Sequence, residues 1–290
     1  MDDRGSARIP ARPAPPAGQA AGVQRNARVR QLAGIGMLVA ALLAFTACSS
    51  GGAVDPESTW WSPEQGQSWQ MQLAGGLDTD VEAQIYDVDS IDTSLKDLEE
   101  AHGKGAHLVC YFNAGAWEEW RGDATGFDQV LLGNELGGWP GERWLDVRRQ
   151  DALLPIMAKR MDACKERGFD AVDPDNVDGY SNDSGFGLSE DDQLAYIRAL
   201  AQLAHERGLG FGLKNAVELV GGLVDEIDFA VNEQCHEYDE CDVYDRLLAA
   251  GKAVVVLEYA MDPKQVCGAV PRGIEVLFKP LELGAERSTC

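Results

Sequence analysis

The chain has 290 residues, 45% of them hydrophobic, and its 48 acidic and 25 basic side chains give a net charge of −23. This length suits one large domain or two small ones. So acidic a chain would be repelled by nucleic acid and by anionic lipid surfaces, whereas a cationic polymer would be attracted to it. We therefore expect no nucleic-acid partner.

The first 47 residues have the composition of an export signal. Residues 1–24, rich in Pro, Ala and Arg, cannot bury a core and are typical of a disordered leader. A positive segment, 25–31, then precedes an apolar run, 32–47, that ends at Cys48. This order is typical of a secretory signal peptide, so we expect an exported protein.

The small residues before Cys48 resemble a lipoprotein cleavage box, which predicts lipidation of that cysteine and anchoring at the membrane surface. Secretion with an unmodified Cys48 is the alternative. The predicted organisation is a leader and signal over 1–47, a tether over 48–58 and one catalytic domain over 59–290. Removal of residues 1–47 takes away six Arg and two Asp and leaves a net charge of −27.

Six cysteines remain after Cys48, an even number that favours disulfides in an exported chain. Cys235 and Cys241 are close enough to close a small loop, whereas the sequence does not assign partners to Cys110, Cys164, Cys267 and Cys290. A zinc site is the competing interpretation. Because the sequence has neither a paired Cys-x-x-Cys array nor His-Glu-x-x-His, we expect no metal, and no cofactor motif is found.

Strand patterns alternate with helical patterns after residue 59. The eight expected strands are 68–73, 83–88, 107–112, 170–173, 210–214, 229–232, 253–259 and 274–278. The expected helices are 94–102, 150–167, 189–207, 217–226, 242–250 and 263–269. Eight strand–helix units at this length favour a single (β/α)8 barrel over a doubly wound sheet. An insertion, 115–146, is expected to form a loop over the cleft, with a short strand at 144–147.

The ends of the expected strands are unusually polar. Asp175 follows a buried strand in the run 170–180, and Glu233 follows another in the run 229–235. In a barrel the carboxyl ends of the strands carry the chemistry. Two such carboxylates, without a metal motif, a Gly-x-Ser-x-Gly elbow or a phosphate-binding loop, indicate glycosyl transfer to water. One carboxyl would donate a proton and the other would attack or stabilise the transition state.

The same segments carry a family resemblance. The run 168–180 (GFDAVDPDNVDGY) and the run 229–235 (FAVNEQC), together with 109–115, 138–148, 212–215 and 238–241, resemble glycoside hydrolase family 114. The resemblance covers residues 60–279 and implies a (β/α)8 barrel that acts as an endo-α-1,4-polygalactosaminidase. It implies Asp175 as nucleophile and Glu233 as acid/base, with Asp173 as the alternative reactive carboxylate, and it agrees with a Cys235–Cys241 disulfide.

The residues that would line the substrate subsites follow from the same resemblance and from the strand ends. They are Asp173, Asn176, Asp178, Lys214, Asn215 and Tyr238, with Tyr86, Asp87, Asp89, Asn113 and Glu258 as further candidates. The expected partner is a cationic galactosamine-containing polysaccharide, bound by a monomer. Two alternatives stay open: hydrolysis of another α-linked glycan, and a non-catalytic lipoprotein that binds an amino-sugar polymer.

Overall fold

A computed structural model describes residues 59–290. The predicted leader, signal segment, tether and lipidated Cys48 lie outside these residues. Within residues 59–290, no helix is both long and apolar enough to cross a bilayer.

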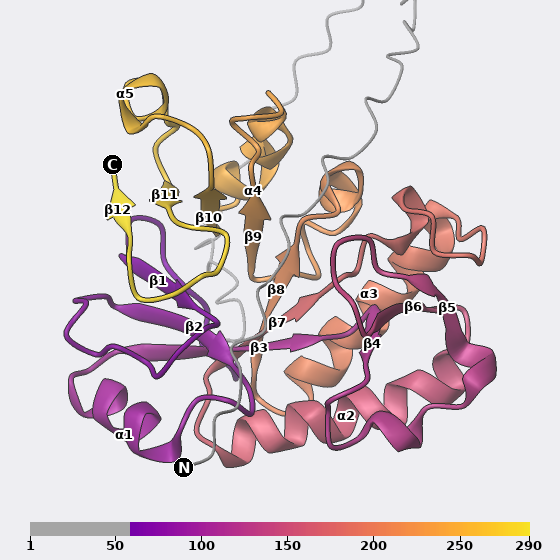
Figure 1. The fold of residues 1–290 in the computed structure, drawn as a ribbon. Coiled ribbons are helices and arrows are strands. Elements are labelled where there is room, and N and C mark those ends of the chain that lie inside the picture. The colour runs from indigo at the N-terminus through magenta and orange to yellow at the C-terminus, as the bar shows by residue number, and fades with distance from the viewer. Residues whose placement is uncertain (1–58) are drawn as a thin grey trace, which may run out of the picture. The chain divides into compact units, whose positions relative to one another are not determined.

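Eight parallel strands curl into a barrel surrounded by helices, so the predicted (β/α)8 fold is confirmed (Figure 1). In sheet order the strands are β1 (Trp69–Gln72), β2 (Ile85–Asp89), β3 (His107–Asn113), β7 (Ala171–Asp175), β8 (Gly210–Lys214), β9 (Phe229–Glu233), β10 (Ala253–Glu258) and β11 (Ile274–Phe278). A short strand, β12 (Ser288–Thr289), pairs antiparallel with β11. All eight expected strands are present.

The α-helices are α1 (Leu95–Gly103), α2 (Gln150–Glu166), α3 (Glu190–His205), α4 (Asp245–Ala249) and α5 (Pro263–Val266). The N-terminus of α3 carries a capping box, because Ser189 Oγ accepts from Asp192 N and the Asp192 carboxylate accepts from Ser189 N. The expected helix 217–226 is instead a 3₁₀ helix, Val217–Gly222. Two consecutive glycines at its end disfavour an α-helix there.

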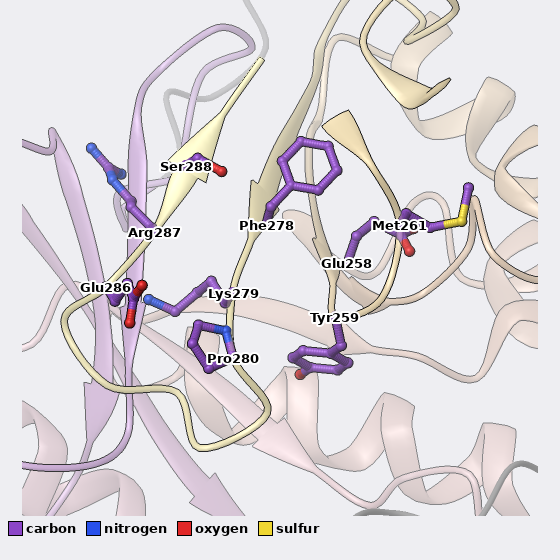
Figure 2. A pocket seen from close by; sticks show the side chains of 9 residues that line it. All are labelled: Glu258, Tyr259, Met261, Phe278, Lys279, Pro280, Glu286, Arg287 and Ser288. Carbon is purple, nitrogen blue, oxygen red and sulfur yellow. The ribbon is translucent and has the colours of Figure 1, made fainter. Parts of the chain in front are cut away.

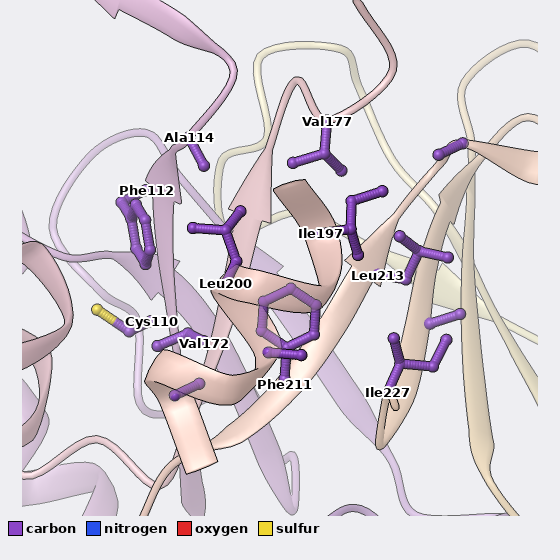
Figure 3. Close-up of a cluster of buried hydrophobic side chains, with 14 of the residues drawn as sticks. Cys110, Phe112, Ala114, Val172, Val177, Ile197, Leu200, Phe211, Leu213 and Ile227 are labelled. Carbon is purple, nitrogen blue, oxygen red and sulfur yellow. The ribbon is translucent and has the colours of Figure 1, made fainter. Parts of the chain in front are cut away.

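Two apolar cores lie on the two faces of the barrel sheet. The outer core packs the sheet against the helices, as where Ile197 and Leu200 of α3 meet Val172 and Phe211 (Figure 3). The inner core fills the barrel and includes Ala171. Because side chains alternate along a strand, the inward face of β7 that starts at Ala171 continues to Asp173 and Asp175. The barrel is therefore apolar at the amino ends of its strands and charged at the carboxyl ends.

The barrel closes between β1 and the segment that follows β11. Leu283 O accepts from Leu73 N at 2.9 Å and from Ala74 N at 3.2 Å. Lys279 Nζ donates to Gln70 Oε1 at 3.1 Å. These bonds join the two edges without a strand ladder between β1 and β11 in the described part of the chain.

The insertion after β3 is not the loop that the sequence predicts. It forms a separate antiparallel sheet of β4 (Ala116–Glu118), β6 (Glu142–Leu145) and β5 (Leu132–Glu135). Gly115 fixes this sheet next to the strand end of β7, because a Cβ at Gly115 would lie 1.7 Å from Asn176 O. The expected short strand at 144–147 corresponds to β6, which begins and ends two residues earlier.

Three disulfides pair all six cysteines of the described residues. Cys235–Cys241 is the bridge that the family resemblance implies. Cys110–Cys164 ties β3 to α2, and Cys267–Cys290 ties the end of α5 to the C-terminal residue.

Candidate active site

Asp175 and Glu233 end two inward-facing rows of side chains, on β7 and β9, and Lys214 ends the row on β8 between them. Lys214 Nζ lies 3.4 Å from Asp175 Oδ1 and 3.7 Å from Glu233 Oε2. Asp175 Oδ1 and Glu233 Oε2, at these distances from one nitrogen, are therefore at most about 7 Å apart, which is below the upper limit of about 9.5 Å for the two carboxylates of a glycoside hydrolase. The two acids therefore converge on one place.

Asp175 accepts hydrogen bonds on both oxygens. Tyr111 Oη, from β3, donates to Oδ2 at 2.7 Å, and the backbone N–H of Asn176 donates to Oδ1 at 2.8 Å. Asn176 itself adopts a left-handed φ of 59°, where the chain turns away from the end of β7. These donors fix the orientation of Asp175, whose side chain keeps 17% of its surface exposed.

Glu233 is held from both sides. Asn215 Nδ2 donates to Glu233 Oε2 at 3.0 Å, and Asn215 Oδ1 accepts from Glu233 N at 2.9 Å. Tyr259, just after β10, donates its hydroxyl hydrogen to Glu233 Oε1. The Glu233 side chain is 14% exposed, so both acids are oriented by the protein and still open to solvent.

Two further carboxylates lie deeper in the barrel. Asp87 and Asp173 are 1% and 0% exposed. Each lies two residues before the end of its strand, β2 or β7, and so faces the barrel interior one layer deeper than the last residue. Burial and the charge of Asp173 raise the pKa of Asp87 well above its usual range, and burial raises the pKa of Asp173 to about 7. Burial alone would lower the pKa of Lys214, but the surrounding carboxylates raise it above its usual range.

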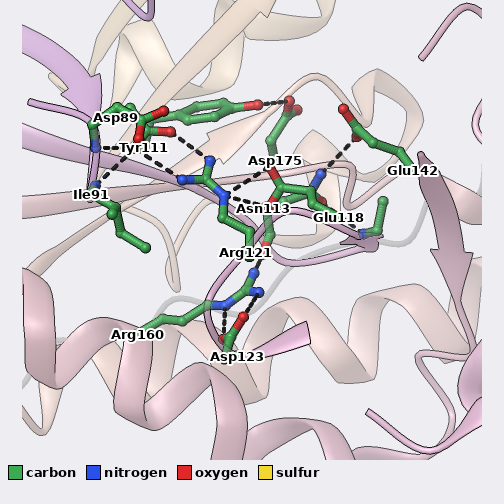
Figure 4. A network of polar contacts seen from close by, with 12 residues as sticks. Asp89, Ile91, Tyr111, Asn113, Glu118, Arg121, Asp123, Glu142, Arg160 and Asp175 are labelled. Carbon is green, nitrogen blue, oxygen red and sulfur yellow. Dashed lines mark hydrogen bonds and ion pairs between the residues drawn. The ribbon is translucent and has the colours of Figure 1, made fainter. Parts of the chain in front are cut away.

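The insertion adds a second charged cluster beside Asp175 (Figure 4). Arg121 binds Asp89 Oδ2 at 2.6 Å and Glu118 Oε2 at 2.9 Å. Asn113 Nδ2 donates to Glu142 Oε2 at 3.2 Å. Burial and the charges of Glu118 and Asp175 raise the pKa of Glu142 to about 8. Asp89 and Asn113, expected to line a subsite, are thus bonded to groups of the insertion.

Other residues expected at the site lie further out. Tyr86 is on the outer face of β2, where its hydroxyl donates to Val81 O at 2.7 Å. Glu258 is 1% exposed and accepts from His236 N at 2.8 Å, and burial raises its pKa to about 7. Tyr238 is 39% exposed, and Asp178 precedes the 3₁₀ helix Gly179–Ser181.

Sequence reasoning did not single out Tyr111, Tyr259, Glu118, Arg121 or Glu142. The two tyrosines stand near the carboxyl ends of expected strands, so the same reasoning that selected Asp175 and Glu233 could have selected them. The other three belong to the insertion, whose fold the sequence pattern does not reveal. Their place beside Asp175 depends on the β4–β6–β5 sheet.

A pocket of about 380 Å³ adjoins Tyr259 at the carboxyl ends of β10 and β11 (Figure 2). Its lining residues are Glu258, Tyr259, Met261, Phe278, Lys279, Pro280, Glu286, Arg287 and Ser288. Because Tyr259 also contacts Glu233, the pocket lies beside Glu233, at the strands of the barrel that are far in sheet order from β3 and the insertion.

One cluster of the described residues has the residue types of a metal site. Cys235, His236 and Cys241 bring ligand atoms within 4.8 Å of one another. Both sulfur atoms form the Cys235–Cys241 disulfide, so neither is available as a thiolate ligand. The cluster does not fit a metal ion.

A (β/α)8 barrel with two converging carboxylates at its strand ends is an arrangement of glycoside hydrolases. The model of glycoside-hydrolase family GH114 matches residues 52–290. The crystal structure of Aspergillus fumigatus Ega3 in complex with galactosamine is 35% identical, with a TM-score of 0.75 over 79% of this chain and 97% of that chain. The chain therefore belongs to glycoside hydrolase family 114 and is a glycoside hydrolase, as its motifs suggested.

The glycoside hydrolase domain of PelA from Pseudomonas aeruginosa shares the fold. It is 14% identical, with a TM-score of 0.58 over 77% of this chain and 98% of that chain. A search of curated protein sequences gives no match.

Proposed function

We propose that this enzyme cleaves internal α-1,4 linkages of a galactosamine-rich polysaccharide, with Asp175 as nucleophile and Glu233 as acid/base. The observation that carries the proposal is the position of Lys214, which contacts both carboxylates and holds them around one space. The substrate class is supported by the similarity to Ega3, which was crystallised with galactosamine.

The chemistry of the substrate fits two protein carboxylates. A free amine cannot act as an internal acetamido nucleophile, so the protein supplies the second carboxylate itself. Glu233 would protonate the oxygen of the leaving sugar as Asp175 attacks the anomeric carbon. Glu233 would then accept a proton from the water that releases the glycosyl group.

The deciding experiment is digestion of a purified α-1,4-linked galactosamine polymer by wild type, Asp175→Asn and Glu233→Gln. Each variant should lose at least about 10³-fold in kcat while keeping the wild-type circular dichroism spectrum. The exposed carboxylates Asp80 and Glu99 give matched controls, Asp80→Asn and Glu99→Gln, which should match the wild type. Full activity in a folded Asp175→Asn or Glu233→Gln variant would rule out the assignment.

The charge of the chain supports a cationic polymer over an acetylated one. With a net charge of −27 after residues 1–47 are removed, attraction of the polymer should weaken as salt screens it. Raising the salt concentration should therefore depress kcat/KM more on a deacetylated polymer than on an acetylated one. An equal response to salt on both polymers would show that capture is not electrostatic.

We also propose export and membrane anchoring through an acylated Cys48, on the strength of the sequence of residues 25–48. Wild type expressed in a bacterium that acylates lipoproteins should incorporate radiolabelled fatty acid and partition into detergent, and Cys48→Ser should do neither. Label in the Cys48→Ser variant, or no label in either protein, would reject the anchor.

A further inference from the structure

Asp87 and Asp173, the two acids beneath the catalytic pair, lie within hydrogen-bonding reach of one another, and no donor of residues 59–290 bonds to either. Asp87 and Asp173 are fully buried, and none of their four carboxylate oxygens has a partner among the described residues. Burying an ionised carboxylate without donors is strongly unfavourable, and burying two of them side by side is more unfavourable still. A proton held by one of the two would supply the missing donor, because it gives a hydrogen bond to the other.

The charged groups around these acids come from three strands. Asp175 on β7, Lys214 on β8 and Glu233 on β9 act on them through charge, and Tyr111 on β3 is the register neighbour of Asp173. Lys214 is 2% exposed, and its ammonium lies 3.4 Å from Asp175 Oδ1 and 3.7 Å from Glu233 Oε2. A cation so deeply buried needs negative charge on more than one side.

We propose that Asp87 and Asp173 share one proton and act as positioning residues. The single negative charge that remains on the pair holds the Lys214 ammonium between Asp175 and Glu233. They act through Lys214, since their burial keeps a substrate away from them. This deepens the proposed function and rests on it for the catalytic role of Asp175 and Glu233. The shared proton itself is a property of the folded protein and does not depend on the substrate.

The shared proton is tested by the melting temperature of wild type, Asp87→Asn and Asp173→Asn between pH 5 and pH 8. The folded wild type keeps a proton that the unfolded chain has lost, so this pair makes the wild type less stable as the pH rises. An Asn at either position cannot titrate and still leaves one donor and one charge. The difference in melting temperature, variant minus wild type, should therefore increase with pH.

The result that would overturn the proposal is a difference in melting temperature that stays constant across this pH range for both variants. Failure of both variants to fold would overturn it as well, because Asn is close in shape to the neutral carboxyl that one position already holds. The exposed Asp80→Asn variant is the control and should follow the wild type at every pH.

The positioning role is tested by the double variant Asp87→Asn/Asp173→Asn, which removes the remaining charge. Its kcat/KM should fall at least about tenfold, and by more than the product of the two single losses, because Lys214 loses its lower anchor. The alkaline limb of its pH profile should also move to lower pH, since one negative charge near Asp175 and Glu233 is gone. A double variant with the wild-type profile would refute the positioning role. If no galactosamine polymer is cleaved by the wild type, the proposed function fails, and the melting temperatures still decide on the shared proton.

Discussion

Two cations, Lys214 and Arg121, lie among carboxylates on either side of Asp175, and their geometry differs. Arg121 binds Asp89 and Glu118 at 2.6 and 2.9 Å, the distances of strong charge-assisted hydrogen bonds. Lys214 is 3.4 and 3.7 Å from Asp175 and Glu233, too far for strong bonds of this kind. Short bonds hold the Arg121 cluster rigidly between two buried acids, whereas Lys214 makes longer contacts with two acids that are both partly exposed to solvent.

A high density of charged side chains is therefore not enough to identify a catalytic group, because the bonding geometry of the cation also matters. The guanidinium has five donors in a fixed fork and can satisfy two carboxylates at once. The ammonium is a compact point charge, so it can offset the negative charge of several acids without forming two parallel hydrogen bonds to any one of them. We therefore expect replacement of Lys214 to damage catalysis most, and replacement of Arg121 to damage stability most.

The largest effect is expected for Lys214→Met, which leaves Asp87, Asp173, Asp175 and Glu233 without their cation. At least one more of the four, besides the acid of the Asp87–Asp173 pair that already holds a proton, should then be neutral at pH 7, because like charges so close cannot all ionise. The expected loss of kcat/KM is on the order of 10³-fold, measured on the galactosamine polymer at a temperature where circular dichroism shows a folded protein. Lys104→Met, at an exposed ion pair of α1, is the matched control. A folded Lys214→Met variant whose kcat/KM stays within tenfold of the wild-type value would contradict the expectation that Lys214 matters most for catalysis.

Arg121→Met should have the next largest effect, and it should act on the free energy of unfolding. Both partners of Arg121 are buried, so removing the guanidinium leaves uncompensated charges, at a cost of about 3 kcal/mol. Urea titration measures this loss. Arg149→Met removes a half-exposed pair with Asp151 and should cost less than about 1 kcal/mol. If both arginine variants lost the same stability, the Arg121 cluster would not be the rigid support described above.

Tyr259→Phe and Tyr86→Phe separate the catalytic region from the outer face of the sheet. Tyr259 donates to Glu233, so its loss should lower kcat by about tenfold to a hundredfold while stability changes little. Tyr86 donates to a backbone carbonyl on the helix side of the barrel, so Tyr86→Phe should cost about 1 kcal/mol of stability and leave kcat/KM near the wild-type value. Initial rates and melting temperatures of the two variants check both statements. A loss of activity in Tyr86→Phe that exceeds the loss in Tyr259→Phe would show that Tyr86 does act at the substrate site.

Tyr86, expected at the substrate site but found on the outer face of β2, shows what the sequence could and could not predict about the site. Val and Ala identify β7 and β9 as buried strands in the sequence, and side chains alternate along each strand. The sequence alone therefore predicted that Asp175 and Glu233 lie close together. In β2, by contrast, Tyr86, Asp87 and Asp89 are all buried, and the sequence of that strand alone does not tell which face is inward. Register with the neighbouring strands decides it.

The fold was largely predictable because eight apolar strand patterns and their helices repeat in order. The insertion was not, because its strands are short and its residues are polar: β4 has three residues, and β5 ends in exposed Asn134 and Glu135. Tertiary contacts, such as Leu145 N donating to Gly115 O, determine these strands. The groups that the insertion brings to Asp175 were missed for the same reason.

The smallest expected effect concerns Glu142, an acid of the insertion whose pKa is raised partly by the charge of Asp175. Its pKa of about 8 means that the folded protein holds a proton that an unfolded Glu, with a pKa of about 4.3, has lost. The free energy of unfolding should therefore fall as the pH rises from about 4 to about 8, and Glu142→Gln should remove this part of the fall.

Relative to the wild type, Glu142→Gln should be stabilised by on the order of 1 kcal/mol at pH 8 and by much less at pH 5, as measured by urea titration at both values. Glu99→Gln, on the exposed surface of α1, should show no such change with pH. A stabilisation that is equal at pH 5 and pH 8 would mean that Glu142 is already ionised in the folded protein. In that case the charge of Arg121 and the hydrogen bond from Asn113 would outweigh the burial of Glu142 and keep its carboxylate ionised in the folded protein.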